Sequence, residues 1–301
     1  MINYINFSVL KSEIDQCQRL FHGRGKAYEG LSHVTVDWLP PVVLITVYQE
    51  EEFATLQGWG NDLREHIPGC RSIQVRYRCR PKTPYEVIWG ESVQQLSVNE
   101  NGLQYLLELG RSQNTGLFLD MANGRSWVRG NASNKRILNL FSYTCGFSVA
   151  ALAGGASHVV NIDVSKASLS KGRENHRLNG QDLKKVTYEA VDIFKSYSRL
   201  KKHGPYDLLI CDPPQFQKGR VDIKRDYAKI IRRLPKFMNA GGQLMLCLNS
   251  PELDIGFLND IMTEESPGSQ FVESVAPPEV FVDVEPGKGL KVLVYQFFPH
   301  N

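Results

Sequence analysis

The stretch "RILNLFSYTCGFSVAALAGGASHVVNID", residues 136–163, decides the fold of this chain. Two short apolar runs, at 136–141 and 158–163, have the length and composition of buried β-strands. A tight turn of small and polar residues and an apolar helical segment separate them. A strand, a turn, a helix and a second strand in this order predict a parallel β-sheet covered by helices.

The same rhythm continues towards the C-terminus. It predicts further strands at 186–191, 206–211 and 241–249, and helices at 165–180 and around 227–237. In the last of these helices Pro235 is expected to produce a kink, because proline lacks the N–H of the helical ladder. Residues 271–298 predict two strands joined by a Pro-Gly-Lys-Gly turn, so the sheet is expected to end in an antiparallel hairpin.

The N-terminal part of the chain has a different pattern. Strand-like segments at 33–38, 42–48 and 71–80 surround one helical segment at 53–67, and residues 96–109 predict a β-hairpin. We therefore expect two domains: a small α+β domain at 1–115, with a role in substrate recognition, and a larger α/β domain at 116–301.

Composition excludes several classes of protein. The 301 residues are 42% hydrophobic and 22% charged, as in globular domains, and the longest apolar stretch, "WLPPVVLITVY", is too short to cross a bilayer. No secretory signal opens the chain, and the six cysteines form no C-x-x-C pair. A cytoplasmic protein without a membrane partner or a metal site is expected. Basic residues crowd into 195–204 and 217–236, which indicates either an acidic partner such as RNA or a solvated helix face.

Three aspartates end three successive predicted strands after the first. Asp163 is placed to accept hydrogen bonds from both ribose hydroxyls of a nucleoside, and Asp192, beside the apolar Ile193, from the exocyclic amine of adenine. Asp212 ends the next strand. One such aspartate alone could be only a helix cap. Three of them beyond a tight first turn favour a nucleoside cofactor, because ligands of open α/β sheets bind at the carboxyl ends of the strands.

The first turn narrows the choice of cofactor. A Rossmann dehydrogenase would carry G-x-G-x-x-G to cradle a pyrophosphate, whereas the turn "YTCGFS" contains the single glycine Gly146. A cofactor without a pyrophosphate fits better, and S-adenosylmethionine is such a cofactor.

Three segments resemble one known family. The segment "NLFSYTCGFSVAALAGGASHVVNIDVSKASLSKGRENHRLNG", together with "DPPQF" and "VNENGLQYLLELGRSQNTGLFLD", is similar to class I S-adenosylmethionine-dependent methyltransferases that modify bases of bacterial large-subunit ribosomal RNA. The similarity starts at about His22. It implies a Rossmann-like seven-stranded sheet, S-adenosylmethionine as cofactor and ribosomal RNA as substrate. The PUA domain of many cytosine-C5 members has no room before His22 and is expected to be absent.

The resemblance also implies roles for single residues. A loop with Thr115, Asp120 and Arg125 would help to cover the cofactor. The other expected cofactor-binding residues are Phe141, Ser142, Tyr143, Thr144, Gly146, Asp163, Val164, Asp192, Ile193 and Asp212. Two positions depart from the family: Cys145 stands where glycine is usual, and Ala122 where members often carry arginine. Cys145 must therefore fit beside the cofactor or tilt the turn.

The segment "LLICDPPQF", residues 208–216, is expected to hold the catalytic residues Asp212, Pro213 and Pro214. Strand alternation directs Cys211 into the core. The Asp212 carboxylate, or the carbonyls after it, can then accept a hydrogen bond from the amino or imino group of a flipped base. Phe216 would either stack on that base or pack at the rim.

The remaining substrate-binding expectations concern phosphate and the nucleophile. Lys218 and Arg225 would contact RNA phosphate, and Asn249 occupies the position where cytosine-C5 members carry their cysteine. Cys247 lies deeper in the strand and is expected in the core, so no cysteine nucleophile is indicated. The stretch "DPPQFQKGRVDIKRDYAKI" with "LMLCLNS" resembles the guanine-N7 members of the family, which implies direct attack by a ring or exocyclic nitrogen of guanine. Cytosine C5 of RNA, a small molecule and a protein side chain stay open as alternative methyl acceptors, and so does a module that binds cofactor or RNA without catalysis.

Overall fold

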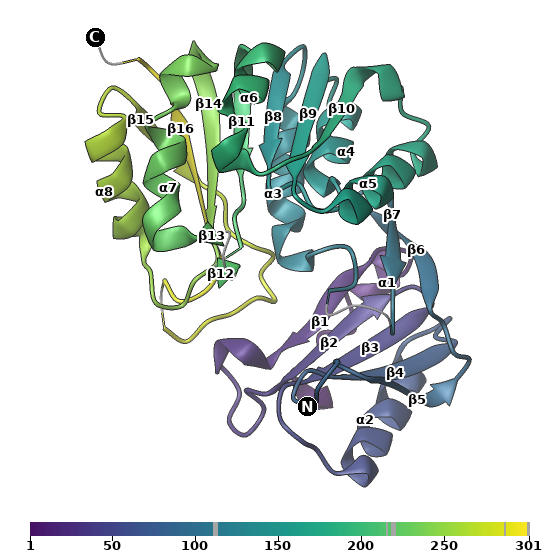
Figure 1. The fold of residues 1–301 in the computed structure, drawn as a ribbon. Helices are drawn as coiled ribbons and strands as arrows, with labels where there is room; N and C mark the ends of the chain where they lie inside the picture. The colour runs from purple at the N-terminus through teal and green to yellow at the C-terminus, as the bar shows by residue number, and fades with distance from the viewer. Residues whose placement is uncertain (111–113, 215, 218–220, 286, 300–301) are drawn as a thin grey trace. The chain divides into compact units, whose positions relative to one another are not determined.

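The computed structural model describes residues 1–110, 114–214, 216–217, 221–285 and 287–299, without the side chains of Lys11, Phe216 and Gln217. The chain forms two compact units (Figure 1). The first contains Met1–Asp120 and Pro278–Glu285, and the second Met121–Pro277 and Pro286–Asn301. No helix within the described ranges is long and apolar enough to cross a membrane.

The first unit has the α+β architecture that the sequence predicts. Its five-stranded sheet has the order β1-β2-β3-β4-β5, in which only the β3–β4 pair is parallel. A separate hairpin turns at Asn101 and Gly102, which both have positive φ, as a two-residue Asn-Gly turn requires. Its elements are η1 (Ile2–Tyr4), α1 (Leu10–Glu13), β1 (Gln18–His22), η2 (Gly23–Gly25), β2 (Val34–Leu39), β3 (Val42–Val47), α2 (Phe53–His66), β4 (Ser72–Tyr77), β5 (Tyr85–Gly90), β6 (Gln95–Glu100) and β7 (Leu103–Glu108).

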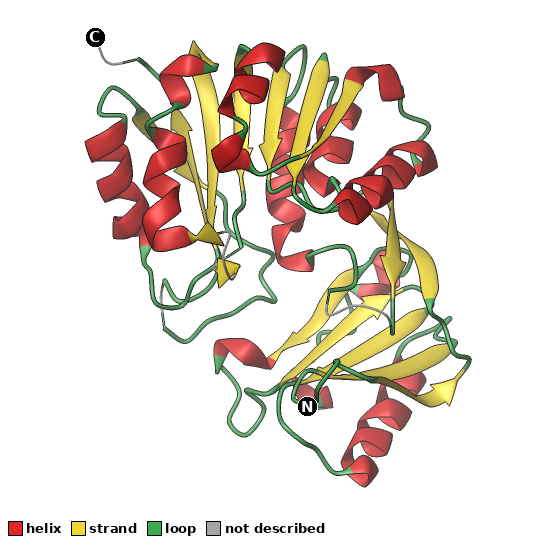
Figure 2. Ribbon diagram, viewed as in Figure 1, coloured by secondary structure: helices red, strands yellow, loops and turns green. Residues whose placement is uncertain are grey.

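The second unit contains the predicted seven-stranded sheet, in the order β10-β9-β8-β11-β14-β16-β15 (Figure 2). The first five of these strands are parallel, and β16 and β15 are antiparallel to their neighbours. Its strands are β8 (Arg136–Leu140), β9 (His158–Asp163), β10 (Val186–Ala190), β11 (Tyr206–Cys211), β14 (Met238–Leu248), β15 (Gln270–Ser274) and β16 (Lys291–Gln296). This sheet confirms the Rossmann-like fold.

Helices cover both faces of this sheet. Side chains of α6, α7 and α8 pack with Leu209 and Cys211 on one face, and those of α3 and α4 pack with Leu208 and Ile210 on the other. The helices are η3 (Leu119–Met121), α3 (Ala122–Asn131), α4 (Gly146–Ala153), α5 (Lys166–Leu178), η4 (Leu183–Lys185), η5 (Ile193–Lys195), α6 (Tyr197–His203), α7 (Ile223–Ile231), η6 (Leu234–Lys236) and α8 (Ile255–Glu265).

Two local expectations were wrong. Pro235 lies in η6, after α7 has ended at Ile231, so it belongs to a new turn and does not kink one long helix. The sheet does end in the antiparallel pair β15 and β16, but β15 ends at Ser274 and β16 begins at Lys291, so a tight turn does not join the two strands directly; Pro286 of the predicted turn lies outside the described residues. After β15 the chain reaches Pro277 and Pro278, which lack the N–H groups of a strand ladder, and residues 278–285 join the first unit, where Val284 N donates to Gly25 O.

A buried chain of polar side chains runs beneath the turn between β8 and α4. It links β8, β9, α4 and α5, and each donor points the same way along it. The links are Asn139 Nδ2 to Asn161 Oδ1 (2.8 Å), Asn161 Nδ2 to Ser148 Oγ (2.9 Å), Ser148 Oγ to His176 Nε2 (3.0 Å), His176 Nδ1 to Gln181 Oε1 (2.6 Å) and Gln181 Nε2 to Val149 O (2.8 Å). This direction needs a neutral His176 with its proton on Nδ1.

This chain predicts a pH-dependent stability. Burial lowers the pKa of His176 to about 4, so below pH 6.5 the unfolded chain takes up this proton before the folded one does. The stabilising contribution is complete above pH 6.5 and is lost as the pH falls towards 4. Between pH 7 and pH 4.5 we expect it to fall by about 2 kcal/mol, and a His176→Gln variant to lack this part. Urea unfolding of both proteins at the two pH values measures it.

The wild-type and His176→Gln proteins share every other titrating group, including His22, whose pKa burial lowers to about 3. The difference between them therefore reports His176 alone. Equal losses of stability in the two proteins at pH 4.5 would contradict a neutral His176 in the folded state.

Candidate active site

The turn between β8 and α4 has an unusual backbone. Three of its five residues before Gly146 have positive φ although none is glycine: Phe141 at 56°, Tyr143 at 46° and Cys145 at 61°. Each such residue costs on the order of 1 kcal/mol or more. Ser142 N donates to Ile162 O at 3.0 Å, and Cys145 N donates to Ser142 O at 2.7 Å. The turn thus keeps one fixed shape at a cost in stability, and such backbone strain is typical of ligand sites.

Asp163, the last residue of β9, holds this turn. Its Oδ2 accepts from Tyr143 N at 2.9 Å and its Oδ1 from Ser165 N at 2.7 Å. A carboxylate has about four acceptor positions, so capacity for two ribose hydroxyls is left. Val164 beside it is 36% exposed and offers an apolar surface at the same strand end.

Asp192 lies at the next strand end, two residues after β10. It caps η5, because its Oδ1 accepts from Phe194 N at 2.9 Å. Asp192 is half-buried, so its carboxylate can also meet a ligand. Ile193, in contrast, is only 3% exposed and packs in the core, so its side chain offers little surface to an adenine ring.

The Cys145 side chain is accommodated in the core behind the turn. Its side chain is fully buried and points at Gly172 of α5. A Cβ atom on Gly172 would lie 2.3 Å from Cys145 Sγ, so the missing side chain of Gly172 makes the room for the thiol. Burial raises the pKa of Cys145, and the thiol behaves as a small core residue.

Other polar groups of the turn fit a bound ligand. Thr144 and Ser142 are both buried. Apart from the weakly bonding thiol of Cys145, no group within the described residues pairs with the hydroxyl oxygen of Ser142. A buried hydroxyl without a strong partner is costly unless a ligand completes it. The turn, Asp163 and Asp192 therefore fit a nucleoside cofactor at the carboxyl edge of the sheet.

Asp212 and Asn249 follow two adjacent parallel strands at this edge. Cys211 ends β11 and pairs in register with Leu246 of β14, so the two strand ends lie side by side. Asp212 is half-buried, Pro213 is buried and Pro214 is exposed, whereas Asn249 is exposed directly after β14. The edge thus presents a carboxylate and an amide from neighbouring strands.

The cysteines of these strands are fully buried, as strand alternation predicts. Cys211 packs in the cluster under α6, α7 and α8, and Cys247 in the cluster on the opposite face. Burial raises the pKa of the Cys211 thiol. Neither sulfur can serve as an accessible thiolate in this conformation.

Lys291 was not identified from the sequence. It lies in β16, is 6% exposed, and its ammonium donates to the carbonyls of Ser250 (2.6 Å), Leu253 (2.6 Å) and Gly287 (2.7 Å). Since an ammonium has three donors, all three are used. Lys291 thereby fixes the loop that follows Asn249. A lysine in a strand-like run carries no sequence signal for such a role.

Three of the residues expected to bind the cofactor lie outside the strand ends of the second unit. Thr115 and Asp120 belong to the first unit, and Asp120 lies in η3. The expectation that Arg125 lies in a covering loop was wrong: it is 5% exposed within α3, because the helix begins already at Ala122.

Of the residues expected to contact the substrate RNA, Lys218 lies outside the described residues. For Phe216 only the backbone is described, in β12 (Phe216–Gln217), which pairs with β13 (Val221–Asp222). Arg225 makes a two-pronged ion pair with Asp226, at 2.8 and 2.7 Å, although its side chain is 61% exposed. Within the described ranges, no group of three or more His, Cys, Asp or Glu side chains could hold a metal ion.

The comparisons with known proteins agree with this geometry. The sequence profile of the S-adenosylmethionine-dependent methyltransferase family matches residues 18–296. The chain belongs to this family. The solved structure of SMU.776, crystallised with SAH (S-adenosylhomocysteine), has a TM-score of 0.86 at 25% identity and covers 96% of this chain and 77% of its own. The predicted fold, cofactor and enzyme class are thereby confirmed.

The names of curated relatives refer to ribosomal RNA methylation. Ribosomal RNA large subunit methyltransferase I of Erwinia tasmaniensis is 34% identical over 186 residues, covering 59% of this chain and 47% of that protein. The protein of the same name from Aliivibrio fischeri is 29% identical over 246 residues, covering 78% of this chain and 62% of its own. This methyltransferase thus spans about half to three fifths of the length of these relatives.

The contact between Cys145 and Gly172 predicts a coupled pair. Gly172→Ala should destabilise the protein by about 1 to 3 kcal/mol, because the new methyl group overlaps the thiol. Adding Cys145→Gly to Gly172→Ala should recover most of this loss, since it removes both the overlap and a left-handed non-glycine residue. A double-mutant cycle of unfolding free energies measures the coupling.

Gly130→Ala is the matched control, because Gly130 also lies in a helix and a Cβ there would meet open space. We expect it to be neutral or slightly stabilising. Additive effects of the Cys145 and Gly172 substitutions would contradict the packing of the thiol against α5.

Proposed function

We propose that this methyltransferase transfers the methyl group of S-adenosylmethionine to a nitrogen of a guanine base in large-subunit ribosomal RNA. The observation that carries the proposal is the edge of β11 and β14, where Asp212 and Asn249 follow adjacent strands while Cys211 and Cys247 are buried. The names of the curated relatives support ribosomal RNA as the substrate.

Methyl transfer to a base nitrogen depends more on the correct placement of the base than on activation of the nucleophile. Bound S-adenosylmethionine supplies a methyl group on a positively charged sulfur, which keeps the electron pair of its bond to that group when a nitrogen lone pair forms the new N–C bond. Asp212 can accept from the imino and amino groups on the Watson–Crick edge of guanine, and so orient the base. At a ring nitrogen such as N7 the product keeps the positive charge, which a neighbouring carboxylate stabilises. At an exocyclic nitrogen a proton must also leave, and Asp212 can accept it.

Cytosine C5 makes a different demand on the protein. This carbon is a poor nucleophile until a thiolate adds to ring carbon six. In this chain the position for that thiolate holds Asn249, which can donate to or accept from a base but cannot add to it. Transfer to nitrogen fits the residues present.

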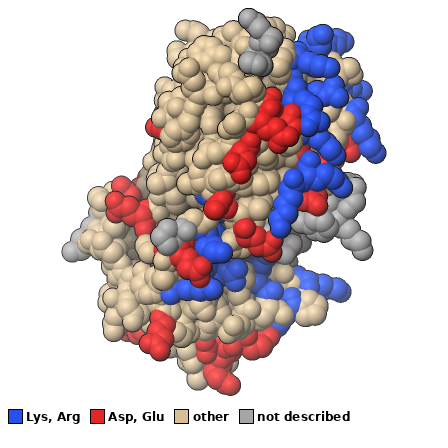
Figure 3. Space-filling view, turned by 90° about the vertical axis from the view of Figure 1, so that its left-hand side faces the viewer, with Lys and Arg blue, Asp and Glu red and all other residues tan. Residues whose placement is uncertain are grey.

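A basic surface supports RNA as the partner. Tyr197 Oη of α6 donates to Lys229 O of α7 at 3.4 Å, and Arg233 stacks over the Tyr197 ring at 5.1 Å, so these helices lie side by side. Exposed basic residues gather on them and on the adjoining turns, and Figure 3 shows a band of lysine and arginine at its upper right. They include Lys195, Lys201, Lys202, Arg232 and Lys236. Such a surface can neutralise phosphates of a nucleic acid.

Methylation of isolated RNA tests this proposal. Large-subunit RNA from cells that lack the protein is incubated with purified enzyme and S-adenosylmethionine, and the nucleosides are separated by mass spectrometry. We expect one methylated guanosine per RNA. A Cys211→Ser, Cys247→Ser double variant should keep the rate within about tenfold, since the loss comes only from packing. Asp212→Ala should lose about a hundredfold or more, because the base is no longer oriented.

Asp182→Ala is the matched control for the aspartate, since Asp182 caps η4 far along the sequence from Asp212 and should leave the rate unchanged. A methylated cytidine, or a covalent adduct with RNA that contains 5-fluorocytidine, would overturn the nitrogen mechanism. Methyl transfer to a protein or a small molecule, with none to RNA, would overturn the substrate.

A further inference from the structure

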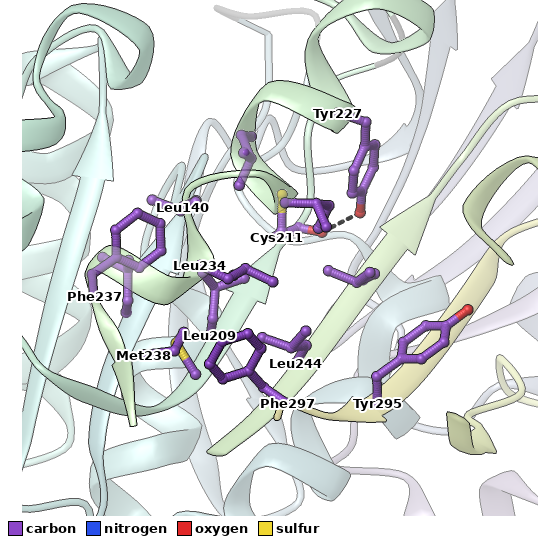
Figure 4. Packing of buried hydrophobic residues seen from close by; sticks show 14 of the residues in the cluster. Leu140, Leu209, Cys211, Tyr227, Leu234, Phe237, Met238, Leu244, Tyr295 and Phe297 are labelled. Atoms are coloured by element: carbon purple, nitrogen blue, oxygen red, sulfur yellow. Dashed lines mark hydrogen bonds between the residues drawn. The ribbon is translucent and has the colours of Figure 1, made fainter. Parts of the chain in front are cut away.

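Tyr227 of α7 connects the two strand ends that carry Asp212 and Asn249. Its hydroxyl oxygen lies 3.2 Å from the carbonyl oxygen of Cys211 and 3.1 Å from that of Cys247. The ring is 2% exposed, and Figure 4 shows the hydroxyl pointing at the end of β11. Cys211 directly precedes Asp212, and Cys247 stands two residues before Asn249.

The Tyr227 hydroxyl supplies a hydrogen-bond donor at a point where the backbone has none. Pro213 and Pro214 have no N–H, so the chain beyond Asp212 cannot continue the hydrogen-bond ladder with β14. The phenol supplies a donor at this point and shares its single proton between the two carbonyls. Burial, above all, raises the pKa of Tyr227, so the phenol stays protonated and remains a donor at neutral pH.

The other contacts of Tyr227 are made by its ring and are packing contacts. Tyr227 belongs to the apolar stripe of α7, with Ile230 and Ile231, and its ring meets Phe257 of α8 edge-on at 6.5 Å. A phenylalanine would fill the same space and keep these contacts. The hydroxyl is therefore the part of the residue that packing does not require.

We propose that Tyr227 is a positioning residue that fixes the separation of the Asp212 and Asn249 strand ends. This inference rests on the proposed function, in which a base binds to these two side chains. A displacement of the base by about 1 Å can cost a hundredfold in rate, so a hydroxyl that bonds to both strand ends, beside the last ladder pair, affects the alignment of the base with the methyl donor. Tyr227 touches neither and acts through the strand ends.

Tyr227→Phe tests the role, and Tyr206→Phe is its control. Tyr206 is also fully buried in the same cluster, and its hydroxyl donates to Leu200 O at 2.9 Å, but it stands at the amino end of β11. Both substitutions remove one buried hydroxyl, which bonds to two backbone carbonyls in Tyr227 and to one in Tyr206. Only Tyr227→Phe removes such a hydroxyl from the carboxyl edge of the sheet.

We expect Tyr227→Phe to lower kcat for RNA methylation tenfold or more, with the KM for RNA and the Kd for S-adenosylmethionine changed less than threefold. Tyr206→Phe should leave kcat within twofold at a similar loss of thermal stability. In hydrogen exchange, the amides of Asp212 and Asn249 should exchange at least tenfold faster in Tyr227→Phe and be unchanged in Tyr206→Phe.

Equal kcat values for the two variants, or unchanged exchange at both strand ends, would overturn the positioning role. Wild-type enzyme that methylates no RNA would instead overturn the proposed function, and the exchange rates would still decide whether Tyr227 holds the strand ends.

Discussion

The two hydrogen bonds of the Asp163 carboxylate are the constraint on which the site depends. They join the end of β9 to the backbone of Tyr143 and Ser165, and so fix the turn between β8 and α4. Without these hydrogen bonds the turn would lose the interactions that offset the conformational strain of its three left-handed residues, none of which is glycine. We propose that the same carboxylate also binds the ribose of the cofactor. One group would then serve both folding and binding, and the cofactor would meet a turn that is already formed.

The carboxyl edge is supported from the core side, and its outer side is left to ligands. Beneath the first turn lies the polar chain through His176, and beside it Gly172 leaves room for Cys145. At the ends of β11 and β14 the hydroxyl of Tyr227 provides the support, because it bonds to a backbone carbonyl of each strand. Lys291 holds the loop that follows Asn249. Each support acts on backbone or on a buried side chain, so the side chains of Asp163, Asp192 and Asn249 are not needed for these supports.

Sequence reasoning reached the larger sheet because its signals are local: apolar runs, an N-cap at Ser165 that accepts from Ser168 N, and aspartates at strand ends. It failed where the outcome depends on tertiary contacts. Nothing in the order of residues shows that Gly172 faces Cys145, or that residues 278–285 leave the sheet for the first unit. Tyr227 fitted the apolar stripe and indeed packs there, but the partner of its hydroxyl depends on two strand ends far away in the sequence.

A crystal structure of the protein with S-adenosylhomocysteine tests the central claim most directly. The account predicts both ribose hydroxyls within about 3 Å of the Asp163 carboxylate, with its bonds to Tyr143 N and Ser165 N retained. Phe141, Tyr143 and Cys145 should keep their left-handed backbone, because the turn is formed before the ligand arrives. A ribose bound elsewhere, or a turn that releases Asp163 to admit the ligand, would contradict it.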